Sequence, residues 1–503
     1  MIAVLLSLAQ VVASFAVEAE GPVRFGIPVD VRVLERGLRL DAGRAAQLQW
    51  SPLATEAPAI GEHVWIELVV SGLSGRARVL LGGAPPSAPA GGPVCRIVTE
   101  QQRETAAELR RTTWSYADGS VDTRERRVLL EADDGAGERR LAGEAIRRES
   151  EALAERRLRV RFEASFWRER GVLPRADGSG RELREALREA VPRLPRAPGA
   201  RGRGDYLRGP QGETVTNQEF DTTLAFARLA LADDDPALLA RARECAWHLV
   251  DVDLDRRSGL PHRHGAEHRE AAPELGHVWT SGALLVAMLC ADRELLDELL
   301  GVVRALAARV RAREPRRGPA DRLRDEAWPL FELESSLRLV DSAPVRAACD
   351  GLVASIVARY DPVLRSFRYG EGETRGGELV RDRIWVTAGI LLPALRLHAA
   401  RRPSRELEAI LDEVGRAVLE TQLDGRSGIA LQVMRSARGP FDAVRVDGAA
   451  EAVLLLDGLE PRDRGRVLAR TGLRRALDGV LSLEHDDLAT RFSIVGRCEW
   501  VMR

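Results

Sequence analysis

The sequence predicts an α+β multidomain protein, in which an N-terminal β barrel or sandwich region is followed by a C-terminal α/α toroid. Before about residue 204, short β-branched and aromatic stretches alternate with Gly, Pro and Ser turns, a pattern typical of strands. After that point, helical segments alternate between continuously apolar ones and ones with a single apolar stripe. Since each helical hairpin can bury its apolar face only against its neighbours, this alternation predicts the inner and outer helices of a ring.

The N-terminal strands are expected at irregular spacing. A loop rich in Pro, Gly and Ala at 82–93 divides them into two β modules, and a linker rich in Pro, Gly and Arg at 192–203 follows a short helix at 181–190. The predicted strands are 23–33, 46–50, 63–70, 77–81, 126–130 and 157–166.

The toroid is expected to combine buried inner helices with amphipathic outer helices, and roughly ten to twelve helices of ordinary size fit its length. Long connections at 253–276, 361–381 and 422–448 each return from an outer to an inner helix. They therefore emerge at one end of the ring, which is the predicted mouth of a site. The predicted inner helices are 280–290, 384–397 and 449–456, and the predicted outer stripes lie within 238–249, 296–303 and 407–418.

All 75 basic residues are arginine, because the chain contains no lysine, and the formal net charge is −1. Without a net basic character, a nucleic acid is not expected as a partner. Arginine instead suits carboxylates, which its guanidinium group binds in a bidentate fashion. The composition therefore favours a small acidic ligand, such as a uronic acid, over a polyanion.

The first 16 residues are similar to a secretory signal peptide. The apolar run from Ile2 to Ala16 is too short to span a membrane and ends in the sequence Ser14-Phe15-Ala16, which suits cleavage. The run lacks a basic start, so the alternative is that it forms the first strand. We expect a secreted or periplasmic protein with no membrane span.

The cysteines are scattered along the chain and odd in number, and most lie on apolar helical faces. This pattern indicates small buried hydrophobes, and neither a disulfide framework nor a zinc ribbon. The five are Cys95, Cys245, Cys290, Cys349 and Cys498.

Asn217 is the only asparagine, and five of the eight histidines follow it within sixty residues. In so biased a composition, a lone amide indicates a position that needs both a hydrogen-bond donor and an acceptor. The alternative is a helix N-cap, where Asn is also preferred. If Phe220 lies within the helix, Asn217 and Asp221 share one face near its N-terminus, where free N–H groups favour a sugar carboxylate.

The residues with catalytic chemistry gather between 204 and 279. His264 and His268 are candidate general bases, because imidazole titrates near neutral pH. His248 lies within an apolar stripe and is alternatively a structural histidine. Asp251 and Asp253 alternatively bind backbone N–H groups where the helix ends.

His262, His264 and His268 are close enough in sequence for a metal site, but they lack a His-Glu-x-x-His pattern. We therefore expect no cofactor and no bound metal, while calcium bridging a substrate carboxylate is left open. Trp279 is either a platform on which a sugar stacks or part of the core.

Several of these motifs occur together in an order that resembles the exo-rhamnogalacturonan lyase-like family. The resemblance implies an N-terminal RIFT-type barrel, a β-sandwich and an α/α toroid. After the possible signal peptide at 1–16, this suggests a barrel at 17–110, an abbreviated sandwich with a linker at 111–200 and a toroid at 201–503. The motifs are Phe25-Gly26-Ile27-Pro28, Gly37-Leu38-Arg39-Leu40, Asn217-x-Glu219-Phe220-Asp221, His248-x-x-Asp251-Val252-Asp253, His264-x-x-x-His268 and His277-x-Trp279.

The resemblance implies β-elimination at the ends of pectin chains, with a uronic-acid-containing oligosaccharide or polysaccharide as partner. By chemical type, His264 or His268 would be the base, Asn217 with Arg208 or Arg263 would hold the carboxylate, and Tyr206 or a second histidine would donate a proton. The further residues expected to contact substrate are Asp205, Glu219, Asp221, His248, Asp251, Asp253, His262, His277 and Trp279.

Two other functions fit the same sequence. A toroid glycoside hydrolase acting on uronic sugars would use a carboxylate pair drawn from Asp205, Asp221 and Asp253. A carbohydrate-binding relative would keep the fold without catalysis. Because the chain has no lysine, any role that lysine has in relatives passes to Arg or His.

Overall fold

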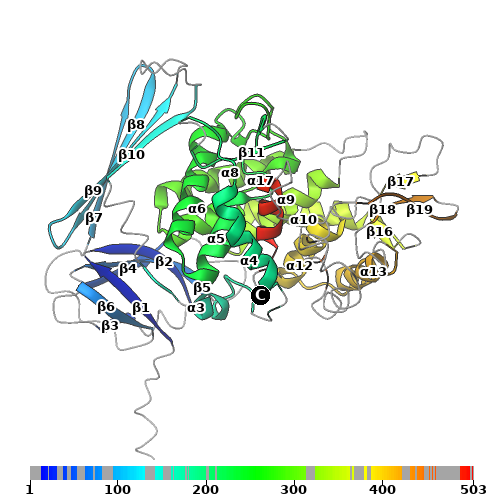
Figure 1. Cartoon of the computed structure of the whole chain (residues 1–503), viewed down its shortest axis with the longest axis horizontal. Coiled ribbons are helices and arrows are strands. Elements are labelled where there is room, and N and C mark those ends of the chain that lie inside the picture. The colour runs from blue at the N-terminus through cyan, green and yellow to red at the C-terminus, as the bar shows by residue number, and fades with distance from the viewer. Residues whose placement is uncertain are drawn as a thin grey trace, which may run out of the picture.

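The structure is a computed structural model of the 503-residue chain, and it is rich in helices with several small sheets (Figure 1). It describes residues 13–20, 22–30, 38–41, 47–53, 63–71, 74–81, 95–130, 142–150, 160–162, 164–175, 178, 180–199, 203–209, 212–312, 323–362, 365–367, 379–381, 387–421, 431–436, 439–446, 453, 456, 459, 488–498 and 501.

The first strands form two antiparallel three-stranded sheets. Phe25, Ile27, Ile66 and Leu68 are buried in the second of them, which packs against the helices. The predicted strands in this region are confirmed, but the closed barrel that the resemblance implies is not. The sheets are β1-β6-β3, from Ala13–Glu20, Ser74–Leu81 and Leu38–Asp41, and β2-β5-β4, from Val23–Asp30, His63–Ser71 and Gln47–Pro52.

Strand β1 begins within the predicted signal peptide and includes its last four residues. Ala13 pairs with Leu81 and Glu20 with Ser74 along the whole strand, so Ser14-Phe15-Ala16 belongs to a sheet. The structure thus supports the alternative in which this segment is the first strand. Residues 1–12 lie outside the described residues, and export remains a prediction.

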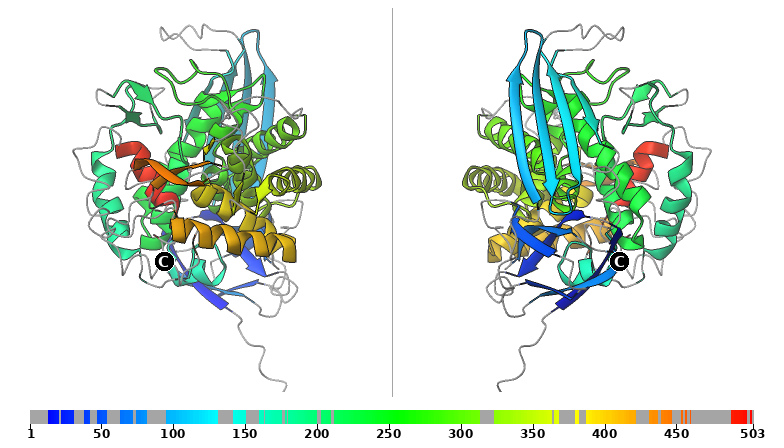
Figure 2. Two further views of the ribbon diagram at one scale, coloured as in Figure 1. Left: turned by 90° about the vertical axis from the view of Figure 1, so that its right-hand side faces the viewer. Right: turned by 90° about the vertical axis from the view of Figure 1, so that its left-hand side faces the viewer.

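A four-stranded antiparallel sheet follows, in the order β10-β9-β8-β7, and it stands beside the helices (Figure 2). The boundary drawn at residue 110 falls inside β8, so one sheet spans the proposed barrel–sandwich junction. The region is a single sheet among its described residues. Its strands are β7 (Cys95–Arg103), β8 (Ala107–Tyr116), β9 (Val121–Leu129) and β10 (Ala145–Glu149).

Two expectations in this region were wrong or incomplete. Strands β7, β8 and β10 were missed because polar residues occupy most of their positions, and the apolar alternation of β8 is limited to Trp114 and Tyr116. The strand predicted at 157–166 is not present in its described part, since residues from Ala164 onward form helix α3 (Ala164–Glu169). Phe162 and Phe166 are four residues apart, a helical spacing, and their rings stack at 4.8 Å.

The helical region has the expected inner and outer layers. Inner helices α5, α7, α9 and α12 each contact the next, and the C-terminal helix α17 packs against α5, so the array returns to its start. This arrangement is consistent with a toroid. The inner helices are α5 (Thr222–Asp233), α7 (Ser281–Leu289), α9 (Arg324–Leu337), α12 (Leu392–Arg401) and α17 (Leu488–Arg497), and the outer helices are α6 (Pro236–His248), α8 (Arg293–Arg311), α10 (Ala343–Val357) and α13 (Arg405–Thr421).

The individual helix predictions largely hold. The short helix predicted at 181–190 is α4 (Arg181–Ala190), and the predicted inner segment at 280–290 is α7, in which every residue is buried. The stripes of α6, α8 and α13 face the core. Of the inner segment predicted at 449–456, only Val453 and Leu456 are described, and both are buried. Parts of the two later long connections also lie outside the described residues.

The remaining described elements are short. Three two-stranded ribbons and one three-stranded sheet join the helices. They are β11 (Leu207–Arg208) with β12 (Thr214–Val215), β13 (Leu254–Asp255) with β14 (Leu260–Pro261), β15 (Tyr360–Asp361) with β16 (Ser366–Phe367), and β17 (Leu379–Arg381), β18 (Leu431–Ser436) and β19 (Gly439–Val446).

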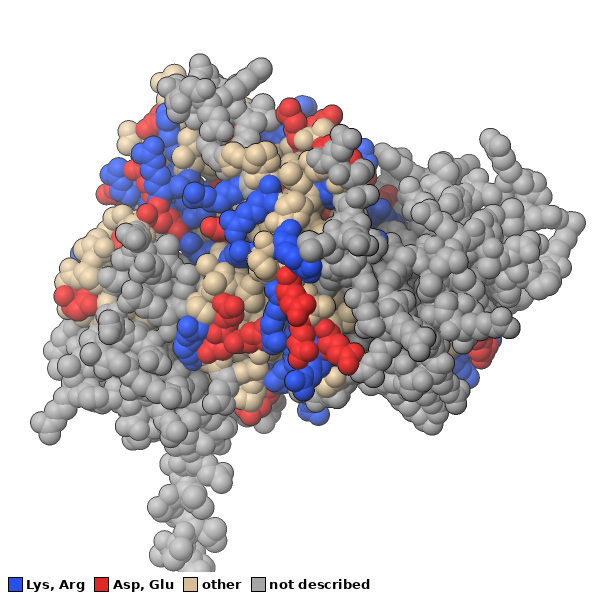
Figure 3. Space-filling view, viewed as in Figure 1, with Lys and Arg blue, Asp and Glu red and all other residues tan. Residues whose placement is uncertain are grey.

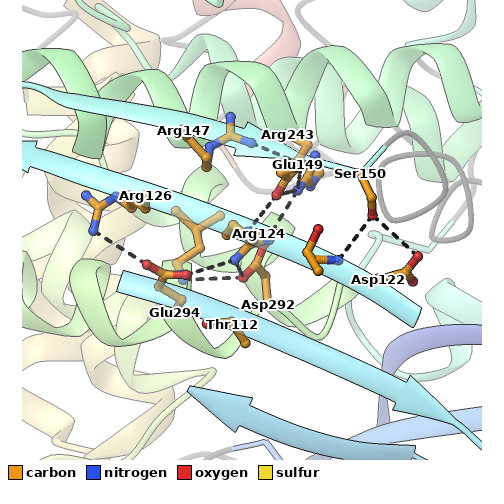
Figure 4. Close-up of polar contacts among 12 residues, drawn as sticks. Thr112, Asp122, Arg124, Arg126, Arg147, Glu149, Ser150, Arg243, Asp292 and Glu294 are labelled. Carbon is orange, nitrogen blue, oxygen red and sulfur yellow. Dashed lines mark hydrogen bonds and ion pairs between the residues drawn. The ribbon is translucent and has the colours of Figure 1, made fainter. Parts of the chain in front are cut away.

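Buried ion pairs join the four-stranded sheet to the outer helices (Figure 4). The guanidinium group of Arg124 donates two 2.7 Å hydrogen bonds to Asp292 at the start of α8 and one of 2.6 Å to Glu149 on β10. It also lies 4.7 Å from the ring of Trp247 on α6. Arg126 makes a second connection, to Asp251 at 2.8 Å. The sheet therefore depends on arginines that have no exposure to water.

Replacing Arg124 with Ala should destabilise the protein by about 3–5 kcal/mol, because Asp292 and Glu149 would keep buried negative charges without their main partner. Arg111→Ala is the matched control on the adjacent strand, since the Arg111–Glu125 pair is exposed and worth about 1 kcal/mol or less. Chemical unfolding measures both values. Equal losses in the two variants would contradict the structural role of the buried pairs.

Candidate functional site

The segment that leads into α5 is an unusual turn. Asn217, Gln218, Phe220 and Asp221 all have φ between 44° and 65°, in the left-handed region that side chains other than Gly seldom adopt. Each such residue costs energy, so the surrounding contacts must hold the turn in place. The helix begins only at Thr222, with Asp221 as its N-cap. Asn217 is therefore neither the N-cap nor on a helical face shared with Asp221.

Asn217 uses both ends of its amide, as its isolation in the sequence suggested. Its Nδ2 lies 2.7 Å from the carbonyl oxygen of His268 and 3.0 Å from that of Arg263, and it donates to both. Its Oδ1 lies 3.2 Å from Nδ1 of the His268 ring. The side chain is buried. Asn217 thus fixes the 262–268 loop against the turn and does not point into open space.

Four buried side chains form what we name the buried histidine–aspartate cluster: Asp205, His248, Asp253 and His268. His248 Nε2 lies 3.0 Å from Asp253 Oδ1 and 3.2 Å from His268 Nδ1. Burial alone would lower the pKa of His248, but the Asp253 and Asp205 carboxylates outweigh it and raise that pKa to about 9. Burial acts to raise the pKa of Asp253, and the two histidines reverse this and lower it.

A second group, the arginine–histidine cluster, comprises Arg208, Glu219, His264, His277 and Arg324. Arg208 pairs with Glu219 and lies 3.1 Å from Nδ1 of His264, whose Nε2 is 3.3 Å from Glu219. Arg324 is 2.9 Å from Nε2 of His277, and the two imidazole rings lie 5.0 Å apart. A neutral His264 with its proton on Nε2 satisfies both neighbours, because Nδ1 then accepts from Arg208.

Both imidazoles of the arginine–histidine cluster are held neutral. Burial, followed by the charges of Arg208 and Arg324, lowers the pKa of His264 to about 4. Burial and Arg324 lower the pKa of His277 to about 2. His264 keeps about a fifth of its side chain exposed. An unprotonated, accessible imidazole is the form that a general base requires.

The cluster lies where three inner helices begin. Glu219 precedes α5, His277 precedes α7, and Arg324 is the first residue of α9. The 253–276 connection supplies His264 from the same end, as expected for the predicted mouth. Helix N-termini carry partial positive charge, which adds to that of the arginines. The electrostatics of this end of the array therefore favour an anion.

Two buried carboxyl groups, those of Asp221 and Glu332, contact the backbone at the starts of α5 and α7. Asp221 accepts hydrogen bonds from the backbone N–H groups of Leu224 and Gly282, and Glu332 on α9 accepts from those of Thr280 and Ser281. Burial and then the charge of Asp221 raise the pKa of Glu332 to about 7. Burial also raises the pKa of Asp221.

Other predicted site residues have structural surroundings. Tyr206 is buried with its ring 5.7 Å from that of Phe226, and burial raises its pKa, so it does not suit a proton donor. Trp279 is 1 % exposed and packs in the core, not on a sugar-facing surface. Asp251 binds Arg126, as described above, and lies outside both clusters.

Two residues of the 262–268 loop differ in exposure. His262 is tied down, with Nδ1 2.7 Å from the carbonyl oxygen of Ala271. Arg263 is about two-fifths exposed, pairs with Glu274 at 3.2 Å, and its charge contributes to lowering the pKa of both His264 and His277. Arg263 is thus an accessible cation beside the arginine–histidine cluster.

Sequence reasoning missed Arg324 and Glu332. Arg324 was one arginine among many, and only the packing of α9 against the 275–277 turn brings it to His277. Glu332 had a usable signal, because it is an acid within the otherwise apolar helical stretch Trp328-Pro329-Leu330-Phe331 to Leu333. A charged group in a fully buried helix indicates a paired or protonated side chain.

A cavity of about 380 Å³ lies among the inner helices, and none of the predicted site residues lines it. Arg228 and Ser281 contribute from the helical array, and Trp65 and Arg170 from the N-terminal part. The part of the described surface that faces the viewer in Figure 3 carries acidic and basic side chains intermingled.

All five cysteines are free and buried, as predicted. Among the described residues, no helix combines the length and the apolar character needed to cross a membrane.

No protein-family model matches the chain, and no curated protein is similar to it. Solved structures with partial similarity include a cellobiose 2-epimerase from Bacillus thermoamylovorans, with a TM-score of 0.45 and 10% identity over 60% of this chain and 89% of that one. An α-1,6-mannanase of Salegentibacter sp. has a TM-score of 0.41 and 12% identity over 65% of this chain and 99% of that one. A polysaccharide lyase has a TM-score of 0.39 and 10% identity over 57% of this chain and 89% of that one.

Their names describe enzymes that act on carbohydrates, and none of the names mentions rhamnogalacturonan. At TM-scores below 0.5 they assign neither a family nor an activity to this chain.

Asn217→Asp should loosen the 262–268 loop, because a carboxylate cannot donate to the carbonyl oxygens of Arg263 and His268. We expect a loss of about 1–3 kcal/mol in local stability, the usual cost of unsatisfied buried acceptors. Hydrogen exchange of the loop amides measures this loss. Unchanged protection of the loop would contradict the role assigned to Asn217.

Glu332→Gln should make stability less dependent on pH. Since the folded state raises the pKa of Glu332 to about 7 from its ordinary 4.5, this residue favours folding at low pH, and that contribution is lost as the pH rises towards 7. We expect the variant to exceed the wild type by about 1–3 kcal/mol at pH 8 and to lose that advantage at pH 5. Thermal unfolding at the two pH values tests this, and an advantage confined to pH 5 would refute it.

Proposed function

We propose that this protein acts on a uronic-acid-containing carbohydrate by β-elimination, with His264 as the catalytic base. The observation that carries the proposal is a neutral, accessible imidazole held among three cations, Arg208, Arg263 and Arg324. β-Elimination from a uronate needs this combination, because a base must take the proton alpha to a carboxylate whose charge cations neutralise.

The contacts of Arg208 suggest how binding prepares the base. In the free protein Arg208 occupies Nδ1 of His264. A substrate carboxylate would compete for the guanidinium group, since charge-assisted bidentate pairs are stronger than a bond to a neutral imidazole. This exchange frees the Nδ1 lone pair. The added negative charge also raises the pKa of His264, which makes it a stronger base.

In the proposed reaction, His264 alone serves first as the base and then as the acid. His264 takes the proton from C5 of the uronate, the electron pair forms the C4–C5 double bond, and the C4–O bond breaks. The imidazolium then returns the proton to the departing oxygen. This route needs no separate acid, which fits the buried position of Tyr206.

The hydrolase alternative has less support. A hydrolytic mechanism needs two carboxyl groups facing the bond to be cleaved. Asp205 accepts hydrogen bonds from the Thr216 hydroxyl and from the backbone N–H of Asn217. Asp221 is the N-cap of α5. Asp253 is hydrogen-bonded to His248 and His268. All three carboxylates are at most 1 % exposed. Their hydrogen bonds serve the fold.

The decisive experiment incubates the protein with rhamnogalacturonan and polygalacturonate fragments and follows ultraviolet absorbance. Elimination creates an unsaturated, absorbing product, hydrolysis yields only reducing ends, and a binding protein yields neither. His264→Gln should reduce the rate by at least about 100-fold, the usual contribution of a general base. His262→Gln is the matched control, because its amide can still donate to the carbonyl of Ala271. Equal activity of the two variants would exclude His264 as the base.

Arg208→Gln should separate carboxylate binding from sugar binding. Removing this cation raises the pKa of His264 above about 4, so its signal in an NMR titration moves to higher pH. Binding of a uronate should weaken by roughly 10- to 100-fold, the cost of a lost charge-assisted bond. A substrate with its carboxyl groups reduced should bind both proteins equally. Equal weakening for both substrates would contradict a carboxylate subsite.

A further inference from the structure

The buried histidine–aspartate cluster lies apart from the proposed base and has no part in the elimination. We propose that Asp205, His248, Asp253 and His268 bind a divalent metal ion, that Zn²⁺ fits them best, and that Asn217 supplies an additional oxygen. The sequence alone predicted no metal, because these ligands come from separate segments and follow no metal-binding spacing.

The ligand atoms already have the spacing of a coordination shell. His268 Nδ1 lies 3.2 Å from His248 Nε2, 3.2 Å from Asp253 Oδ1 and 3.6 Å from Asp205 Oδ2, while His248 Nε2 is 3.0 Å from Asp253 Oδ1. Ligands about 2.0–2.1 Å from a tetrahedral zinc lie roughly 3.3 Å apart. The four separations given above lie on either side of that value, and ligand atoms of Asp205, His248 and His268 all lie within 4.8 Å of one another. An ion would therefore fit once Asp205 shifts towards the other ligands.

The orientation of His248 also suits a ligand. Its Nδ1 is 3.0 Å from the backbone carbonyl of Arg203, an acceptor that requires the proton on Nδ1. A metal ion would then take the place of the Nε2 proton, which in the free protein is directed at Asp253 and His268. A carbonyl that fixes the tautomer in this way is the usual outer partner of a metal-binding histidine.

A second observation is an unsatisfied oxygen. Asp253 is fully buried, and its Oδ2 has no hydrogen-bond partner among the described residues. Asp205 is 1 % exposed. Two carboxylates shielded from water are costly, and a divalent ion bound to both would offset their charge.

Charge distinguishes this cluster from the other group with suitable spacing. Ligand atoms of Glu219, His264 and His277 also lie within 4.8 Å of one another. Arg208 and Arg324, however, each contact one of those imidazoles, so a cation there would be repelled. The charged groups acting most strongly on His248 are Asp253 and Asp205, both negative. The two clusters are therefore suited to opposite charges.

Metal binding would explain how three segments at the N-terminal end of the inner helices are held together. The ligands come from the segment before β11, from the ends of α6 and its following turn, and from the 262–268 loop. One ion would join all three to the left-handed turn through Asn217. Since His264 lies on the same loop, the ion would position the proposed base without touching substrate.

The test is calorimetric titration of the chelator-treated full-length protein with ZnCl₂. We expect one Zn²⁺ per chain with micromolar or tighter affinity, and a higher Tm once the metal is bound. Asp253→Asn and His248→Gln should each weaken binding at least tenfold, whereas His277→Gln, from the arginine–histidine cluster, should not.

Co²⁺ gives a measurement that does not depend on variants that might misfold. The wild-type protein should acquire the strong visible absorption of four- or five-coordinate cobalt, and Zn²⁺ should displace it. Absence of Zn²⁺ binding by the wild type, or binding that the His277 variant abolishes and the Asp253 variant retains, would overturn the proposal. Because neither readout involves turnover, the metal site and the lyase activity can fail separately.

Discussion

The candidate site depends on one turn that the backbone would not adopt by itself. Four side-chain-bearing residues between 217 and 221 are left-handed, and they are held there by hydrogen bonds to Gly204, to the 262–268 loop and to the first turns of α5 and α7. The turn brings Glu219 to one side and Asn217 to the other. Its geometry therefore sets the positions of both polar clusters at once.

The two clusters use the same residue types for opposite electrostatic purposes. Histidines beside arginines are neutral and favour an anion, whereas histidines beside aspartates favour a cation. They are connected through the loop that carries His264 and His268. If the proposed substrate binds beside the first cluster, the second is a charged support next to it, which is the arrangement expected of a preorganised active site.

The sequence predicted the layers of the fold better than the details of the site. The alternation of buried and amphipathic helices identified α6, α7, α8 and α13, because burial acts directly on side-chain polarity. It missed β7 and β8, in which polar residues occupy most positions and leave little of that pattern. The lone Asn217 was correctly singled out as using both donor and acceptor, but its backbone conformation and the partners Arg324 and Glu332 follow from tertiary packing, which spacing along the chain does not encode.

The outer strand of the four-stranded sheet has a consequence for how the protein behaves in a crowded solution. In the described part of the chain β7 pairs on one side only, and eight of its nine residues are exposed, including Ile97 and Val98. A free strand edge can recruit another chain through its backbone. Arg96, Glu100 and Arg103 lie on this strand, and their charge opposes such recruitment. Self-association is thus restrained by a few surface charges, so high salt, which screens them, is the condition that would promote it.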